Sequence, residues 1–301
     1  MRYGLIGLGS LGANLAGSLV REGLDVTVND IDPARAAALL EAGARWGESP
    51  EAVAAAVDAV ITCLPSPTIS ERVLDAMLPA MKAGGAQHWI EMSTVSREDV
   101  LRLAEKAREE GVETLEAPVT GGVHLAARGE ITVLIGGDAA VFEAHRRAFE
   151  AMGNRIFHMG PLGNASLIKV ITNMMAFIHL QSCSEGLMLA AKGGLDLKTA
   201  WEAIAASSGT SFVHETEGQL ILNGSHQIDF TMDLALKDLG FATGFAEEFG
   251  IGLPLMERTR AVFEAASARY GGQAQSPRIA GLLEEAAGLE MRAEGFPAHL
   301  E

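Results

Sequence analysis

The stretch Gly7-Leu8-Gly9-Ser10-Leu11-Gly12 decides the fold class of this chain. It follows a short β-like run, Tyr3–Ile6, and opens an amphipathic helical stretch, Leu11–Glu22. In that context, three glycines at this spacing are typical of the turn that holds a dinucleotide pyrophosphate. The first glycine permits a tight turn, the second lets the backbone approach the phosphates, and the third lets the helix pack closely on the strand. Unpaired N–H groups at the helix N-terminus then attract the anion.

An acidic residue follows the second predicted strand. Asp25–Asn29 has the strand pattern, and Asp30 comes next, 18 residues after Gly12. A carboxylate at this place accepts hydrogen bonds from the adenosine ribose hydroxyls and repels a 2′-phosphate. Ile31 follows, so no cation is adjacent in sequence, and Arg35 is expected to face solvent. The pattern favours NAD as the cofactor, and NADP is the less favoured alternative. The same residues could also form a plain turn with an exposed aspartate that binds no cofactor.

The first 160 residues alternate strand and helix patterns. The predicted strands are Tyr3–Ile6, Asp25–Asn29, Ala59–Leu64, His88–Met92, Glu113–Ala117, Ile131–Ile135 and Arg155–His158. The predicted helices between them are Leu11–Glu22, Pro33–Ala42, Pro50–Ala56, Ile69–Met81, Arg97–Glu110 and Ala139–Ala151. Such alternation predicts an α/β fold, a Rossmann-type doubly wound and mainly parallel sheet with helices on both faces.

Strand patterns disappear after Gly163, and long helical patterns follow, broken near 193–194, 207–209, 223–224, 250–254 and 271–272. The sequence therefore predicts a dinucleotide-binding domain over 1–162 and an all-α substrate and oligomerisation domain over 163–301. A long interdomain helix over about 163–191 is expected to open the second domain. A domain built on one long apolar helix suggests a homodimer or a homotetramer packed through helices.

Composition and charge exclude several classes of protein. The formal net charge is −16, which disfavours nucleic acid and anionic membranes as partners. The apolar stretch 165–191 carries Lys169, Asn173 and Glu185, so burial in protein is favoured over a lipid-spanning helix. Eight scattered histidines without ligand spacing argue against a metal. Two cysteines in apolar surroundings and a start unlike a signal peptide favour the cytoplasm.

Two further segments carry possible chemistry. Thr120-Gly121-Gly122 follows a predicted strand, and such a turn exposes backbone N–H groups that bind a carboxylate, although it is also an everyday turn. Lys169 lies in an apolar helical segment, with Asn173 one turn further on the same face. A lysine there either reaches solvent or is buried with partners. Burial would lower its pKa and make it a usable proton shuttle.

With these motifs the chain resembles the β-hydroxyacid dehydrogenases, the group that contains 3-hydroxyisobutyrate dehydrogenase and tartronate semialdehyde reductase. The resemblance spans about residues 3 to 270, with the motifs in family order. They are Gly7-Leu-Gly-Ser-Leu-Gly12, Leu64-Pro65, Glu91-Met-Ser93-Thr94, Ala117-Pro-Val-Thr-Gly-Gly122, Gly160-Pro-Leu-Gly163 with Lys169 and Asn173, Ser207-Ser-Gly-Thr-Ser211, and Phe230-Thr-Met-Asp-Leu-Ala-Leu-Lys237-Asp238-Leu-Gly240.

The resemblance implies roles for these residues. Lys169 would be the general acid/base and Asn173 would help to position it. In oxidation, neutral Lys169 would take the hydroxyl proton while hydride leaves the β-carbon for the nicotinamide, without a metal. The small carboxylate substrate would be bound by Ser93, Thr120, Gly121 and Gly122. The cofactor contacts would be Gly7, Leu8, Gly9, Ser10, Leu11, Gly12, Asn29, Asp30, Leu64, Pro65, Thr94 and, from the second domain, Lys237.

The chain departs from the family pattern at several positions. Thr120 stands where serine is common, Thr172 where asparagine is frequent, and Ala165 where a glycine is usual. The closing segment near 271–277 and the tail from about 290 do not match. These departures concern substrate contacts and packing more than the proton shuttle.

Three other functions are compatible with the same architecture. An imine reductase would usually carry aspartate or tyrosine in place of Lys169. A non-catalytic nucleotide-binding homologue would not need the whole motif set. A decarboxylating phosphosugar-acid dehydrogenase would need more placed cations for its phosphate.

Overall fold

The computed structural model describes residues 1–300, and its contacts divide the chain into two compact units. The first unit is Met1–Lys169 and the second begins at Val170. One helix, α8 (Asn164–Lys192), runs through this boundary. The division at 162/163 that the sequence suggests therefore lies at the turn before α8, and the division by contacts lies inside the helix, because the first turns of α8 pack with the first unit.

A six-stranded parallel sheet forms the centre of the first unit, in the order β3-β2-β1-β4-β5-β6. Its strands are β1 (Arg2–Ile6), β2 (Asp25–Asn29), β3 (Arg45–Trp46), β4 (Ala59–Thr62), β5 (His88–Glu91) and β6 (Glu113–Glu116). The order reverses next to β1, as in doubly wound sheets that bind nucleotides at the carboxyl ends of their strands. The predicted Rossmann-type fold is confirmed.

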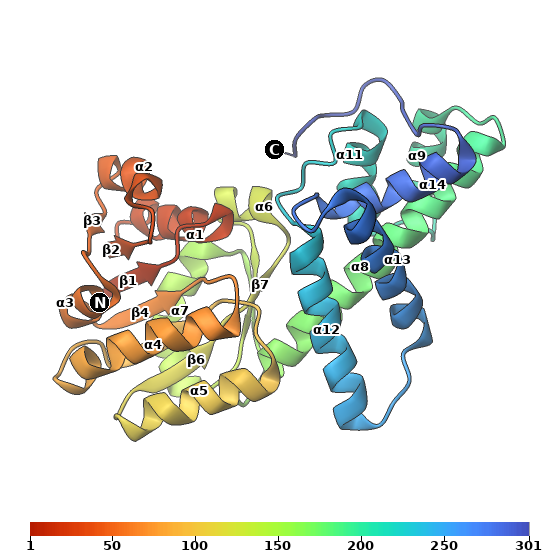
Figure 1. Ribbon diagram of the computed structural model, residues 1–301. Coiled ribbons are helices and arrows are strands. Elements are labelled where there is room, and N and C mark those ends of the chain that lie inside the picture. The colour runs from red at the N-terminus through yellow and green to blue at the C-terminus, as the bar shows by residue number, and fades with distance from the viewer. Residues whose placement is uncertain (301) are drawn as a thin grey trace. The chain divides into compact units, whose positions relative to one another are not determined.

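Helices cover both faces of this sheet (Figure 1). The first unit contains α1 (Ser10–Arg21), η1 (Pro33–Ala36), α2 (Ala37–Glu41), α3 (Pro50–Ala56), α4 (Pro67–Lys82), α5 (Arg97–Glu109), α6 (Val123–Arg128) and α7 (Ala139–Met152). Strand residues alternate between two cores, because successive side chains point to opposite faces. Leu5 packs in the core with α1 and α7, and Ile6 packs in the core with α3, α4 and α5.

A second, three-stranded sheet was not anticipated as a separate layer. It consists of β7 (Val119–Thr120), β8 (Thr132–Ile135) and β9 (Arg155–His158), with β7 antiparallel to β8 and β8 parallel to β9. Two of its strands were predicted, but the two-residue strand β7 is too short for a periodic signal. The Thr120-Gly121-Gly122 turn therefore leaves the edge of this small sheet and leads into α6.

The second unit is helical, as predicted. After the common helix α8 it contains α9 (Leu197–Ala205), α10 (Phe212–Glu215), α11 (Glu217–Asn223), α12 (Met232–Phe249), α13 (Pro254–Tyr270), η2 (Ser276–Ile279) and α14 (Ala280–Ala287). Five of these helices, α8, α9, α11, α12 and α13, end at the predicted breaks. Gly224 and Gly250 close α11 and α12 in the left-handed conformation, which glycine adopts without a steric penalty.

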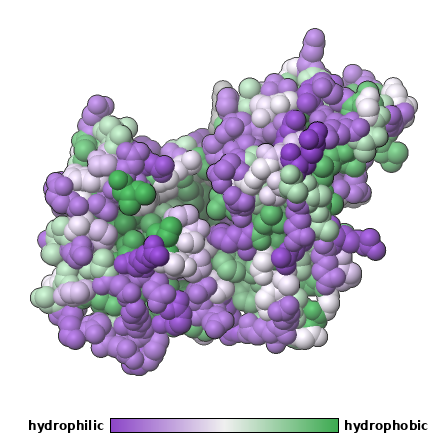
Figure 2. Space-filling model, in the orientation of Figure 1, coloured by the Kyte–Doolittle hydropathy of each residue, from purple (hydrophilic) through white to green (hydrophobic). Residues whose placement is uncertain are grey.

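The long helix α8 carries both predicted catalytic side chains. Lys169 and Asn173 are 8% and 9% exposed, although one side chain carries an amine and the other an amide. Within residues 1–300, no helix is both long and apolar enough to cross a membrane. Hydrophilic side chains predominate on the face shown in Figure 2, with hydrophobic ones in smaller groups between them.

Candidate active site

The glycine-rich loop between β1 and α1 has one position that is open to a ligand. A Cβ on Gly7, whose φ is +100°, would lie 2.3 Å from the carbonyl oxygen of Cys63, and one on Gly12 would lie 2.0 Å from that of Gly7. These two glycines are required by the packing of the protein itself. For a Cβ on Gly9, the nearest atom in the described chain is Arg35 Nη1 at 3.8 Å. The space beside Gly9 fits a pyrophosphate.

The N-terminus of α1 is available for an anion. Gly9 occupies the N-cap, and within residues 1–300 no side chain caps the helix and no acidic residue lies in its first turn. The free N–H groups and the helix dipole therefore face the space beside Gly9. Asp30 holds the same loop, because its carboxylate accepts hydrogen bonds from Leu8 N at 2.6 Å and from Asp32 N at 2.9 Å.

Asn29 has a supporting position at the end of β2. It is 7% exposed, its carbonyl accepts from Gly7 N at 3.0 Å, and its side-chain amide donates to Gly47 O at 2.8 Å. These bonds join the glycine loop to the ends of β2 and β3.

Arg35 is a cation that sequence reasoning assigned to solvent. Its side chain is 51% exposed and lies 3.6 Å from Asp32, but the guanidinium also lies beside Gly9. A 3₁₀ turn, η1, brings it back toward the glycine loop. The sequence signal that could have revealed this is Pro33, which favours a tight turn directly after the acidic residues.

A chain of hydrogen bonds fixes the loop after β4, where Leu64 and Pro65 were predicted to line the cofactor. Leu64 N donates to Ser93 Oγ at 2.8 Å, and Ser93 N donates to Glu91 Oε1 at 2.7 Å. Ser93 is 4% exposed and Glu91 is fully buried, so burial raises the pKa of the Glu91 carboxyl. Thr94, the neighbouring predicted contact, is half-buried. In this geometry Ser93 supports the loop through its hydroxyl.

The predicted carboxylate-binding turn has a backbone that only glycine adopts easily. Gly121 and Gly122 have φ angles of +126° and +88°. Thr120 is half-buried at the edge of the small sheet. The His124 ring lies beside Gly122, at 3.0 Å from the place of a Cβ there. Burial and the nearby Arg128 lower the pKa of His124, so the imidazole is neutral at pH 7.

A buried carboxylate organises the start of α8. Glu116, at the end of β6, accepts hydrogen bonds from the backbone of Gly163, Ala165 and Ser166. Lys169 follows three residues later on the same helix, in the same unit as the glycine-rich loop and Thr120. Nothing in the local sequence pattern connects residue 116 with residue 163, so this contact could not be predicted from the sequence.

In the second unit, Asp238 brings two predicted site residues together. Asn173 Nδ2 donates to Asp238 Oδ2 at 2.6 Å, and Lys237 Nζ forms an ion pair with Asp238 Oδ1 at 3.2 Å. Asp238 is 2% exposed. It also orients the Asn173 amide, which lies 65 residues away in the chain.

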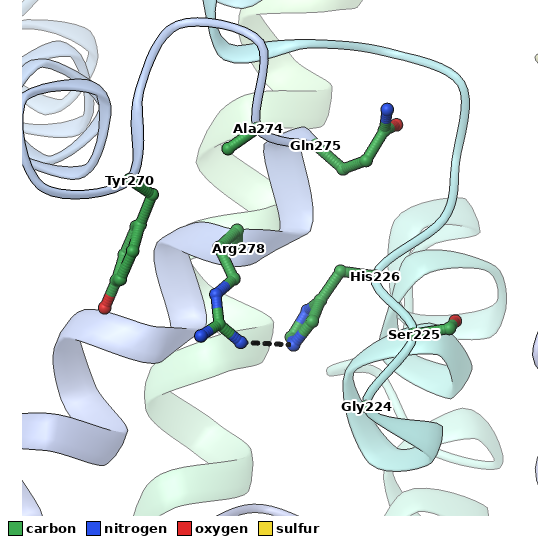
Figure 3. A pocket seen from close by; sticks show the side chains of 7 residues that line it. All are labelled: Gly224, Ser225, His226, Tyr270, Ala274, Gln275 and Arg278. Carbon is green, nitrogen blue, oxygen red and sulfur yellow. Dashed lines mark hydrogen bonds between the residues drawn. The ribbon is translucent and has the colours of Figure 1, made fainter.

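A separate pocket of about 340 Å³ lies within the second unit (Figure 3). Arg278 points toward His226, donating to its Nε2 at 3.3 Å, and its guanidinium lies 5.0 Å from the Tyr270 ring centre. The lining residues are Gly224, Ser225, His226, Tyr270, Ala274, Gln275 and Arg278. All of them lie outside the predicted site.

Comparison with known families agrees with the two-part architecture. Residues 2–160 match the NAD binding domain of 6-phosphogluconate dehydrogenase, and residues 163–283 match the NAD-binding family of NADP-dependent 3-hydroxyisobutyrate dehydrogenase. The mitochondrial 3-hydroxyisobutyrate dehydrogenase of Drosophila melanogaster is 32% identical over 272 residues, which cover 87% of this chain and 83% of the relative. The chain belongs to the β-hydroxyacid dehydrogenase family.

Other β-hydroxyacid dehydrogenases match over almost their whole length. The 2-(hydroxymethyl)glutarate dehydrogenase of Eubacterium barkeri is 33% identical over 295 residues, 97% of each chain. The crystal structure of a 3-hydroxyisobutyrate dehydrogenase from Salmonella typhimurium superposes with a TM-score of 0.86 at 28% identity, covering 94% of this chain and 99% of that one. The protein is thus an NAD(P)-dependent oxidoreductase of the β-hydroxyacid dehydrogenase family.

Proposed function

We propose that this β-hydroxyacid dehydrogenase interconverts a small 3-hydroxy acid and its semialdehyde with NAD(H), using Lys169 as general acid/base and no metal. The observation that carries the proposal is the burial of Lys169. It is 8% exposed in the first turns of α8, in the same unit as the glycine-rich loop and the Thr120 turn. A buried amine without the water that stabilises its charged form exchanges protons near neutral pH more readily than a surface lysine does.

The residues present fit a dinucleotide. The open space at Gly9 and the uncapped N-terminus of α1 suit the pyrophosphate. Asp30 supports a preference for NAD, because its carboxylate opposes a 2′-phosphate, and Arg35 is the cation through which NADP would be tolerated. Leu64, Pro65, Thr94 and Lys237 complete the proposed contacts. When bound, the cofactor supplies the hydride acceptor or donor.

The substrate carboxylate would be held at the Thr120 turn. The Thr120 hydroxyl and the N–H groups of Gly121 and Gly122 are the donors that we assign to it, with the buried Ser93 hydroxyl as a further donor. In oxidation, Lys169 accepts the proton of the 3-hydroxyl, and in reduction its ammonium returns that proton to the developing alkoxide. Asn173, oriented by Asp238, positions the amine and the substrate.

The first experiment is NADH formation at alkaline pH with a panel of 3-hydroxy acids. The panel contains 3-hydroxyisobutyrate, 3-hydroxypropionate, glycerate, serine and 2-(hydroxymethyl)glutarate, with NADP tested in parallel. We expect turnover with at least one acid and a higher kcat/KM with NAD. Lys169→Ala should lower kcat by about 10² to 10⁴ with unchanged NADH affinity.

Lys192→Ala is the matched control on the same helix, because Lys192 is an exposed lysine that donates to Ala287 O. It should retain full activity. Absence of turnover with every acid, despite tight NADH binding, would refute the proposed reaction and favour an imine substrate or a non-catalytic protein. Full activity of Lys169→Ala would refute the assignment of the general base.

A further inference from the structure

The carboxylate of Glu116 collects four hydrogen bonds from one helix start. Oε1 accepts from Gly163 N at 2.5 Å and from Ala165 N at 2.9 Å. Oε2 accepts from Ser166 N at 2.9 Å and from the Ser166 hydroxyl. Glu116 is completely buried. It is therefore the N-terminal cap of α8, supplied by a strand that lies 47 residues earlier in the chain.

Two glycines, Gly163 before α8 and Gly136 beside Glu116, make this contact possible. The first N–H groups of a helix have no partner inside the helix, and the residue before α8 is Gly163, which has no side chain to cap them. A Cβ on Gly136 would lie 2.2 Å from Glu116 Oε1, so only glycine leaves room for the carboxylate. The backbones of Glu116 and Gly136 also exchange two hydrogen bonds.

The Glu116 carboxyl lies at the N-terminus of α8, where the helix dipole favours a negative charge. Burial raises the pKa of Glu116, and the four hydrogen bonds act in the opposite direction. Both oxygens accept, and a carboxylate beside N-terminal N–H groups is stabilised by the helix dipole. The pKa of Glu116 is raised overall by its burial, and because every contact to its two oxygens comes from a donor we infer a carboxylate there. Lys169 comes three residues after Ser166, so the anion lies within one helical turn of the stretch that carries the lysine.

The same residue starts the segment that leads to the predicted substrate turn. Glu116 ends β6, and Thr120 follows four residues later. One side chain thus connects the backbone before Thr120 with the backbone before Lys169. An error of about 1 Å between a substrate and its base lowers turnover by about 100-fold, so such a connection matters to the reaction.

We propose that Glu116 is a positioning residue for the dehydrogenation, which holds Lys169 in register with the Thr120 turn and raises the proton affinity of its amine. This inference rests on the proposed function for its kinetic consequence. Its electrostatic consequence does not, because an anion near the helix start favours the ammonium form of Lys169 whether or not a substrate turns over.

The titration of Lys169 tests the electrostatic part without any activity. The full-length protein is reductively methylated with ¹³C-formaldehyde, and the dimethyl-lysine signals of its six lysines are followed against pH by NMR. Lys169→Arg identifies the signal. We expect Glu116→Gln to lower the Lys169 midpoint by about 0.5 to 1 unit. The control Glu113→Gln, at the exposed end of the same strand, should leave it unchanged.

Kinetics test the positioning part. We expect Glu116→Gln to lower kcat by about 10- to 100-fold with NADH affinity within twofold of the wild type. The midpoint of the oxidation rate against pH should shift to lower pH by the same amount as the NMR midpoint. Glu116→Asp keeps the charge but is one methylene shorter, so it should lower kcat and leave the Lys169 midpoint in place.

The outcomes separate this inference from the proposed function. An inactive wild type whose Lys169 midpoint shifts in Glu116→Gln would refute the reaction and retain the electrostatic coupling. Variants that lose only thermal stability, with wild-type kcat and an unchanged midpoint, would overturn the inference. If Glu116→Gln does not fold, Ser166→Ala removes one donor and keeps the charge. Full kcat in both Ser166→Ala and Glu116→Asp would then overturn the positioning.

Discussion

Gly9 and Gly12 stand three residues apart in one loop, but a side chain at each would meet different neighbours. At Gly12 a Cβ meets the Gly7 carbonyl oxygen at 2.0 Å, which is backbone and cannot move aside. At Gly9 it meets only the end of Arg35, at 3.8 Å. The first glycine of this pair is therefore free of packing demands from the described chain, and the second is required for the helix to approach the strand.

Gly9→Ala and Gly12→Ala should consequently fail in different ways. We expect Gly9→Ala to keep the melting temperature of the wild type and to weaken NADH binding by at least about tenfold, because a methyl group occupies the pyrophosphate space. Gly12→Ala should destabilise the fold by about 1–3 kcal/mol through overpacking. Thermal melts and NADH fluorescence titrations measure both effects. Unchanged NADH affinity in Gly9→Ala would contradict our placement of the pyrophosphate.

Asp30 and Arg35 illustrate how far a single residue can be read from sequence. The acidic residue after the second strand was recognisable from its spacing. Its hydrogen bond to Leu8 N, and the position of Arg35 beside Gly9, depend on the turn η1, which folds the chain back on itself. Sequence spacing locates a residue along a strand, but it does not show which side chains a turn brings back toward the glycine-rich loop.

At the scale of elements, α11 begins with a carboxylate in an unfavourable place. Burial raises the pKa of Glu217 to about 7, although the Thr216 hydroxyl donates to it. The neighbouring thiol of Cys183 is affected as well, since burial and Glu217 raise its pKa to about 12. The second unit therefore contains a carboxyl that is protonated in the folded state up to about neutral pH.

This carboxyl predicts a pH-dependent stability. The folded pKa of about 7 exceeds the ordinary value of 4.5, so the folded state binds the proton more tightly, and stability falls as pH rises from 4.5 to 7. Glu217→Gln removes this loss. We expect the variant to exceed the wild type by up to about 3 kcal/mol at pH 8 and to differ little at pH 4.5, in urea unfolding curves. An equal difference at both pH values would contradict the burial of the charge.

Helix α8 shows what an element-scale pattern reveals and what it conceals. Its apolar composition predicted a helix over about 163–191, and the helix runs over Asn164–Lys192. Its N-terminal cap could not be predicted, because Glu116 is remote in sequence. Likewise, β7 and α6 have two and six residues, too few for the periodic patterns on which sequence reasoning depends.

At the scale of the whole molecule, the second unit exposes large apolar side chains. Leu189 is 76% exposed, Leu195 61%, Phe212 55% and Leu255 59%. A chain with a net charge of −16 has ample polar residues for its surface. Apolar side chains that gather into a contiguous patch mark surfaces that bind another protein, whereas singly exposed ones are ordinary. The sequence predicts that the second unit serves oligomerisation, and these side chains are the first candidates for its interface.

We expect a homodimer or a homotetramer at micromolar concentration, measured by light scattering after size-exclusion chromatography. Leu189→Glu should shift the distribution toward smaller species, because a buried, unpaired carboxylate is unfavourable in an apolar interface. Leu40→Glu, at a 40% exposed leucine of the first unit, is the control and should not change the mass. A monomeric wild type would refute the proposal.

The sequence by itself determined the doubly wound first unit, the helical second unit and the glycine-rich loop that opens α1. These depend on local periodicity and on glycines at fixed spacing, which a linear chain displays directly. Only the tertiary structure decided which side chains orient the site: Asp238 with Asn173 and Lys237, Glu91 with Ser93, and Glu116 with the start of α8. Two of these connect residues 50 or more positions apart. Glu116 meets α8 where a strand end lies beside a helix start, and Asn173 meets Asp238 where two helices pack, so a local sequence pattern carries no record of either contact.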